Sequence, residues 1–222
     1  MHLLVTNDDG VNAPGLLALT QALRSVGRVT VMAPDKNWSA SGHVKTMHKP
    51  LRVRETRLAY GSPAFASDGA PSDCVALALL GFIPEPIDIV VAGINPYANI
   101  GHDVTYSGTV TAAMEAAICK VPGIAVSVDG GENGGKVRGA GDEAAAYSAA
   151  AEWAARIAAE VGKRGLPPYT ILNVNVPALP VEKIKGVQVT RQGLRVYRDE
   201  LVRRLDPRGV PYYWIGGEAP TG

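Results

Sequence analysis

Residues 88–94 read DIVVAGI, and this stretch decides the fold class. Its apolar run is unbroken, which is typical of a strand buried on both faces of a parallel sheet. Comparable runs occupy residues 3–6, 28–33, 123–128 and 169–176, and helical patterns occupy residues 14–25, 71–80, 108–119 and 142–161. Because strands alternate with helices, we expect an α/β fold in which helices cover both faces of a mostly parallel sheet.

The character of the chain changes after Pro177. Extended patterns occupy residues 187–190, 195–204 and 210–216. The sequence DPRG at residues 206–209 is a strong turn signal between the last two of them. We therefore divide the chain into a domain over residues 1–177 and a β-rich appendage with a long hairpin over residues 178–222. A lone hairpin packs poorly, so we expect the appendage to serve in oligomerisation.

The composition argues against several classes of protein. The chain has 222 residues, 46% of them hydrophobic, which is enough for a sizeable core. Its net charge of +1 argues against duplex nucleic acid as the main partner. No apolar run reaches the roughly 18 residues of a membrane span. Asp8 and Asp9 interrupt the start of the chain before any leader pattern develops. We expect a soluble protein that is cytoplasmic and has no membrane partner.

The stretch TNDDG at residues 6–10 ends the first predicted strand with two adjacent carboxylates. Ligands of parallel α/β sheets bind outside the carboxyl ends of the strands, so this position suits a site. Neighbouring side chains on a regular strand point apart, and these two converge only if the backbone leaves the strand, which Gly10 permits. Converging carboxylates suit a hard cation such as Mg²⁺ or Mn²⁺. The alternative for Asp8 and Asp9 is a solvated turn that caps the next helix.

Three further polar clusters follow predicted strand ends or open a helix. Residues 39–43, SASGH, form either an ordinary loop or a source of one hydroxyl ligand and of amides for an anion. Asn95 follows the DIVVAGI strand and is either a turn residue or a neutral oxygen ligand. Residues 106–110, YSGTV, open a helix with free amides, hydroxyls and a glycine, and they suit a phosphate cradle and an ordinary N-cap equally well.

Together these motifs resemble a known family. The segments TNDDGVNAPGL, APDKNWSASGH, SDGAPSDCVALAL, AGINPYANIGHDVTYSGTVTAAMEA and DPRGVPYYW are similar to those of the SurE (survival protein E) family. The resemblance runs from residue 1 to about residue 216. It implies a Rossmann-like fold with a C-terminal hairpin and a divalent-metal-dependent nucleotidase. Such an enzyme hydrolyses nucleoside 5′-monophosphates, with 3′-monophosphates and short polyphosphates as further candidate substrates. The resemblance also implies homodimers or homotetramers that exchange C-terminal segments.

The resemblance assigns roles residue by residue. It implies one Mg²⁺ or Mn²⁺ ion per subunit, with Asp8, Asp9, Ser39 and Asn95 as its protein ligands. The positions that it implies for phosphate contact are Asn99, Ser107, Gly108 and Thr109, with Gly42 beside them. Asp8 and Asp9 are the expected catalytic carboxylates, and either of them acts as the acceptor of a water proton or as a nucleophile.

Three features of the chain depart from the family pattern. Tyr97 stands where members usually carry glycine, and we expect it to affect which base or sugar fits. Residues 69–74 read GAPSDC where members usually read GTPADC, with little expected effect because the segment opens a helix. The family continues past the hairpin with a final strand, whereas this sequence ends at Gly222. Either a tail is missing from the sequence or the exchanged segment is short.

The competing hypotheses are modules without turnover. Receiver domains of signalling proteins also place an acidic pair after their first strand. They need a phosphoacceptor Asp at one later strand end and a Lys at another. At the corresponding positions this chain carries Asn95 and then Asp129, with no Lys. A nucleotide-binding protein is the second alternative, and metal-dependent turnover separates it from an enzyme.

Overall fold

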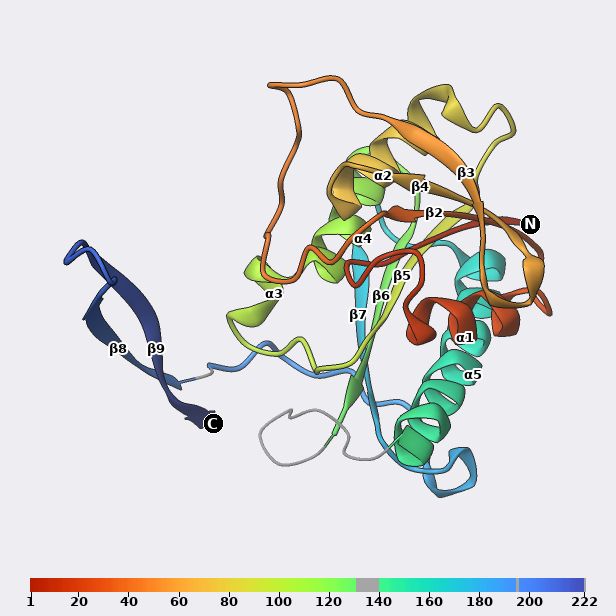
Figure 1. Ribbon diagram of the computed structural model, residues 1–222. Coiled ribbons are helices and arrows are strands. Elements are labelled where there is room, and N and C mark those ends of the chain that lie inside the picture. The colour runs from red at the N-terminus through yellow and green to blue at the C-terminus, as the bar shows by residue number, and fades with distance from the viewer. Residues whose placement is uncertain (131–139, 195, 222) are drawn as a thin grey trace.

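A single seven-stranded sheet forms the body of the protein (Figure 1). The computed structural model describes residues 1–130, 140–194 and 196–221. In spatial order the strands are β3 (Val53–Arg57), β4 (Pro63–Ser67), β2 (Arg28–Pro34), β1 (His2–Thr6), β5 (Ile89–Asn95), β6 (Gly123–Asp129) and β7 (Ile171–Pro177). Every neighbouring pair is parallel except β3 and β4, which are antiparallel. The predicted mostly parallel α/β sheet is confirmed.

Helices cover both faces of the sheet, and alternate residues of β1 divide between the two layers. Leu3 and Val5 pack in the cluster that includes α1 (Pro14–Leu23) and α5 (Ala140–Arg164). Leu4 packs in the cluster that includes α2 (Pro71–Leu77) and α4 (Gly108–Ile118). All three side chains are fully buried, as a strand covered on both sides requires.

The structure differs from the sequence prediction in five segments. Strands β3 and β4 were not predicted, because β3 is a half-exposed edge strand whose sequence VRETR lacks an apolar pattern. The helix predicted over residues 71–80 ends at Leu77 and continues as a π-helical turn, Ala78–Phe82. Helix α5 is longer at both ends than predicted. Residues 187–190 lie in irregular chain and pair with none of the described strands.

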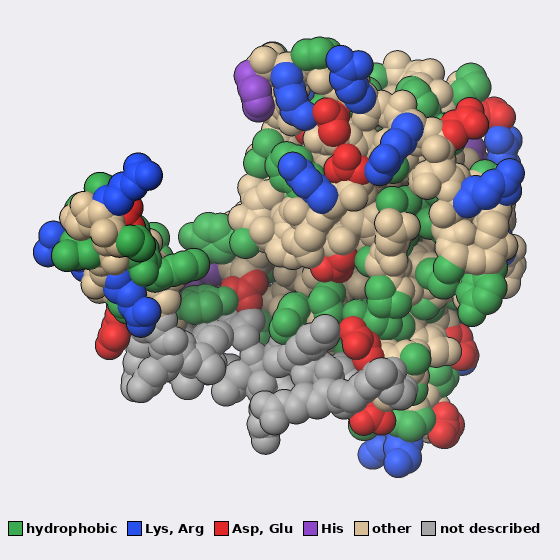
Figure 2. All heavy atoms as spheres, in the orientation of Figure 1, with side chains coloured by type: hydrophobic (Ala, Val, Ile, Leu, Met, Phe, Trp, Pro, Cys, Tyr) green, Lys and Arg blue, Asp and Glu red, His purple; other side chains and the backbone are tan. Residues whose placement is uncertain are grey.

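The C-terminal hairpin is confirmed as a separate two-stranded sheet of β8 (Val196–Leu205) and β9 (Pro211–Thr221). It projects away from the body (Figure 1), and hydrophobic side chains gather on its surface (Figure 2). The side chain of Asp206 fixes its turn, because Oδ1 accepts hydrogen bonds from the amides of Arg208 and Val210 at 2.8 and 2.9 Å. Among the helices that the structure describes, none combines the length and the apolar character needed to cross a membrane.

Candidate functional site

The turn at residues 7–10 takes the two carboxylates off strand β1. Asn7 is fully buried, and its side chain spans the turn: Nδ2 donates to the carbonyl of Gly10 at 3.0 Å, and Oδ1 accepts from the Gly10 amide at 3.2 Å. Gly10 has φ +101°, a conformation that side chains disfavour. The carbonyl of Asp8 accepts a 2.7 Å hydrogen bond from the Trp38 amide, which joins this turn to the loop after β2.

Asp8 lies buried against the N-terminus of α4. Its Oδ1 accepts a 2.5 Å hydrogen bond from the Thr109 hydroxyl, and its side chain is also stabilised by the backbone amides of Gly108 and Thr109. Asp8 is only 3% exposed, and this burial raises its pKa although the hydrogen bonds act in the opposite direction. The structure therefore brings a predicted metal ligand into direct contact with two predicted phosphate-binding residues.

Gly108 makes this close approach possible. A Cβ atom at residue 108 would lie 2.7 Å from the Cβ of Asp8 and 3.0 Å from its Oδ2. Any larger residue would push the first turn of α4 away from the acidic turn. Glycine is needed here because there is no room for a side chain.

The other predicted metal ligands follow the ends of neighbouring strands. Strand β5 lies beside β1, and a register shift after Ala92 brings Asn95 opposite Ser127. The Asn95 side-chain nitrogen donates to the backbone carbonyl of Tyr97 at 2.6 Å, so its Oδ1 is the end that can act as a ligand. Ser39 is exposed in the loop after β2, which borders β1 on its other side.

Asn37 links two of these ligands and was not recognised in the sequence. Its Nδ2 donates to Asp9 Oδ1 at 3.4 Å, and its Oδ1 accepts from the Ser39 amide at 2.8 Å. Tyr147 of α5 was also missed. Burial, the adjacent Glu143 and then the charge of Asp9 raise its pKa, so this phenol lies near the acidic turn. A single asparagine in an APDKNWS segment and a tyrosine in a long helix carry no local signal of such roles.

The predicted phosphate-binding residues differ in how they are engaged. Ser107 is an N-cap, with Oγ accepting from the Val110 amide at 3.2 Å. Gly42 lies against the start of the same helix, since its amide donates to the Tyr106 carbonyl at 2.9 Å. Asn99 is 5% exposed, and its Nδ2 donates to Ser127 Oγ at 2.8 Å, which directs this end of the side chain toward β6. Ser107, Gly42 and the amides of Gly108 and Thr109 therefore gather at one helix N-terminus.

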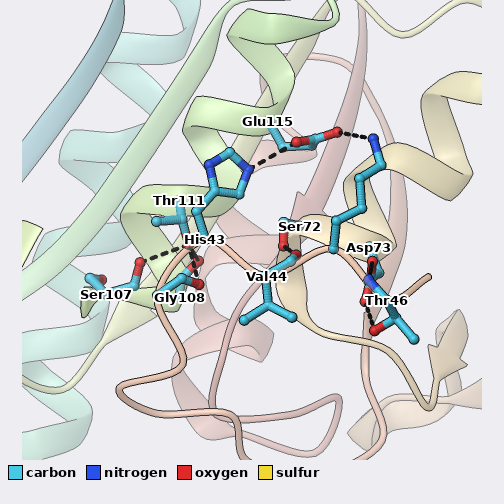
Figure 3. Close-up of polar contacts among 11 residues, drawn as sticks. His43, Val44, Thr46, Ser72, Asp73, Ser107, Gly108, Thr111 and Glu115 are labelled. Carbon is cyan, nitrogen blue, oxygen red and sulfur yellow. Dashed lines mark hydrogen bonds and ion pairs between the residues drawn. The ribbon is translucent and has the colours of Figure 1, made fainter. Parts of the chain in front are cut away.

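The loop that carries Ser39 and Gly42 is also held by helix α2. Ser72 Oγ donates to the carbonyl of Val44, and the carboxylate of Asp73 accepts from both the amide and the hydroxyl of Thr46 at 2.9 and 2.7 Å (Figure 3). The sequence suggested only that this segment opens a helix. Asp73 does so, by accepting from the Ala70 amide at 2.9 Å, but it also anchors the loop.

The donor set suits a hard divalent cation. The groups that lower the pKa of Asp8 are a hydroxyl and backbone amides, all of them neutral, so a buried carboxylate is held without a compensating charge from those groups. In the described part of the chain no cluster of three or more His, Cys, Asp or Glu side chains could hold a metal. Two carboxylates with neutral oxygens from Ser39 and Asn95 match a cation such as Mg²⁺, which retains several waters. The residues present thus fit the implied metal.

Comparisons with known proteins identify the family of the chain. The family model described as Survival protein SurE matches residues 3–199. A 5′-nucleotidase SurE of Herpetosiphon aurantiacus is 54% identical over 223 residues, which cover 100% of this chain and 84% of that protein. A 5′-nucleotidase SurE of Geobacter sulfurreducens is 51% identical over 221 residues, which cover 100% and 79%. The crystal structure of the SurE protein from Aquifex aeolicus gives a TM-score of 0.79 at 40% identity and covers 99% of this chain and 83% of that chain. This chain belongs to the SurE family.

Proposed function

We propose that this protein is a 5′-nucleotidase, a phosphomonoesterase that converts nucleoside 5′-monophosphates to nucleoside and phosphate with one Mg²⁺ or Mn²⁺ ion per subunit. The observation that carries the proposal is the contact between Asp8 and the N-terminus of α4. It joins the acidic half of a metal site to an anion-binding helix start. Similar proteins from two organisms carry the name 5′-nucleotidase SurE, which supports the same reading.

In this proposal, Asp8 and Asp9 hold the cation, with Ser39 and Asn95 completing its protein ligands. A bound cation would neutralise charge at a phosphoryl oxygen and would lower the pKa of a bound water. Asn37 supports the set, because its amide group bridges Asp9 and Ser39.

The start of α4 binds and orients the phosphate. The positive end of the helix dipole favours an anion at this point, where the amides of Gly108 and Thr109 already stabilise the Asp8 side chain. Gly42 lies against this helix start, and Ser107 fixes the first turn of the helix as its N-cap. Asn99 is assigned to the phosphate by the family resemblance alone. The fixed dipole of the helix start stabilises charge on the phosphoryl oxygens without reorganisation.

Asp9 is the carboxylate that we assign as the acceptor of the water proton. It is half-buried, whereas Asp8 is 3% exposed and bonded to Thr109. A proton acceptor must reach a water on the substrate side, which the more exposed carboxylate does better.

The test is phosphate release from a panel of nucleoside 5′- and 3′-monophosphates and short polyphosphate, with Mg²⁺, Mn²⁺ or EDTA. We expect release that requires the metal and is fastest with a 5′-monophosphate. Asp9→Asn should lower kcat by at least about 100-fold, in the range of general-base catalysis. Full activity of a folded Asp9→Asn protein would exclude the assignment. Binding of nucleotide and metal without any release would favour the nucleotide-binding module instead.

The proposal extends to assembly and location. The appendage over residues 178–222 is proposed to join subunits into a homodimer or homotetramer, because hydrophobic side chains are exposed along its hairpin. A cytoplasmic location remains a prediction from the sequence.

A further inference from the structure

A buried carboxylate on α4 has no role in the site described above. Glu115 is 4% exposed and lies seven residues, or about two helical turns, after Gly108. An ionised carboxylate at this depth destabilises a fold unless charged or hydrogen-bonding groups compensate it. The groups that contact the Glu115 carboxylate therefore indicate the role of this residue.

Two side chains of the loop after β2 contact the Glu115 carboxylate. His43 Nε2 lies 2.9 Å from Oε2, and Lys45 Nζ lies 3.4 Å from Oε1, so each carboxylate oxygen has one partner (Figure 3). The His43 side chain is 31% exposed and the Lys45 side chain 60%, so His43 is the better shielded and stronger partner. One turn earlier on the helix, the Thr111 hydroxyl lies 2.9 Å from the Ser107 carbonyl of its own helix and 3.1 Å from the Gly42 carbonyl of the loop.

The loop depends on such contacts because it has no core of its own. Residues 35–52 contain neither helix nor strand, and none of them, all within the described chain, is buried. A loop with little buried apolar surface opens locally at low cost in free energy unless polar contacts hold it. This loop carries Ser39 and Gly42, which need fixed positions opposite the start of α4.

We infer that Glu115 is a positioning residue: with His43 and Lys45 it holds residues 39–45 against α4. One helix then sets both halves of the phosphate site. Its N-terminus carries Gly108 and Thr109, and its buried carboxylate fixes the loop that brings Ser39 and Gly42 to this helix start. The inference rests on the proposed function for the roles of Ser39 and Gly42, but the tether itself can be measured without turnover.

The experiment uses the full chain and three variants of the tether. Glu115→Gln removes the charge at nearly constant shape. His43→Ala removes the donor, and His43→Gln restores one, because the glutamine amide nitrogen can take the place of Nε2. The matched control is Lys49→Gln, which breaks the exposed 2.8 Å ion pair of the same loop with Asp68, away from α4.

Three quantities are measured for each variant. They are hydrogen exchange of the amides in residues 37–46, binding of inorganic phosphate with Mg²⁺, and the kinetic constants for a nucleoside monophosphate. For Glu115→Gln and His43→Ala we expect exchange about tenfold faster and phosphate binding about tenfold weaker, the effect of losing one hydrogen bond to a charged group. KM should rise more than kcat falls. His43→Gln should recover most of the loss, and Lys49→Gln should match the wild type.

Two results would overturn the inference. One is unchanged exchange and phosphate binding in both Glu115→Gln and His43→Ala. The other is faster exchange throughout the protein, or an equal effect of Lys49→Gln, since either would make Glu115 an ordinary structural residue. If Glu115→Gln does not fold, the two His43 variants decide the question alone. A wild type that releases no phosphate would reject the proposed function, while exchange would still test the tether.

Discussion

Asp8 shows how a site residue can be costly to the fold that contains it. Its burial raises its pKa above the ordinary value of 3.8. For a group whose folded pKa is raised, the stabilising contribution is fully present below the unfolded pKa and is lost as pH rises through the folded pKa. Ionised Asp8 therefore destabilises the metal-free protein at neutral pH. A bound cation offsets this effect by compensating the charge.

This linkage predicts how the stabilisation by metal depends on pH. The increase in melting temperature on adding Mg²⁺ should grow as the pH rises from the ordinary carboxyl pKa of 3.8 toward neutrality, because protons and metal compete for Asp8. Thermal unfolding of the wild type and of Asp8→Asn, with and without Mg²⁺, is the measurement. The variant should show little increase at any pH. An increase in the wild type that stays constant across this range would contradict the argument.

Tyr97 allows metal binding and substrate choice to be tested separately. Its backbone carbonyl accepts from Asn95, but its ring is 48% exposed beside the site. Tyr97→Gly keeps that carbonyl and removes the ring. We expect the metal-induced rise in melting temperature to remain, while the ranking of purine and pyrimidine monophosphates by kcat/KM changes by severalfold, the effect of a lost stacking contact. Unchanged ranking would show that the ring does not contact the nucleoside.

The sequence predicts a site residue only where the residue belongs to a recognisable local pattern. Two carboxylates before a glycine at a strand end are unusual enough to indicate a cation, and Ser107 before an apolar helix indicates a helix start. Asn37 and Glu115 act through partners in distant parts of the chain, Asp9 and His43, that only folding brings near them. No local pattern announces such contacts.

At the scale of elements, the same distinction separates the predicted strands from the missed ones. Strands β1, β5 and β6 are buried on both faces, so their apolar runs are visible in the sequence. Strand β3 is an edge strand whose position depends on pairing with β4. Its sequence VRETR is mostly exposed and therefore lacks the apolar run that marks a buried strand. Residues 187–190 show the opposite error, because a strand was predicted there and none formed. An alternating pattern permits a strand but does not supply a neighbouring strand to pair with.

The packing of α4 against the acidic turn gives a prediction at this scale. Gly108→Ala places a methyl group 2.7 Å from the Cβ of Asp8, so the helix and the turn must separate. We expect activity to fall by at least about tenfold, because a displacement of this kind disturbs catalytic geometry. The metal-induced rise in melting temperature should also shrink.

Gly193→Ala is the matched control for this prediction. A Cβ atom at residue 193 meets nothing within 4 Å, so phosphate release and thermal unfolding should match the wild type. If Gly108→Ala also behaved like the wild type in both assays, the close approach of α4 to Asp8 would not be needed for the site.

At the scale of the whole molecule, the hairpin forms a sheet of its own and contacts the body through Tyr197, whose hydroxyl donates to Asp103. A two-stranded sheet is marginal in water by itself, and this one exposes large apolar side chains on both strands. Leu201 and Ile215 are cross-strand partners and are 68% and 82% exposed. Contact with another subunit would bury such a pair, as in the obligate interfaces of homo-oligomers.

This exposure predicts an oligomer that two substitutions should break. Replacing both Leu201 and Ile215 by lysine should shift the molar mass in solution from a dimer or tetramer toward the monomer, because two charges cannot be buried in an apolar interface without partners. Light scattering coupled to gel filtration measures the mass. Leu80→Lys alters a leucine on the body that is 78% exposed, and it should leave the mass unchanged. A double variant that keeps the wild-type mass would show that subunits join through another surface, and a monomeric wild type would remove the proposed role of the hairpin.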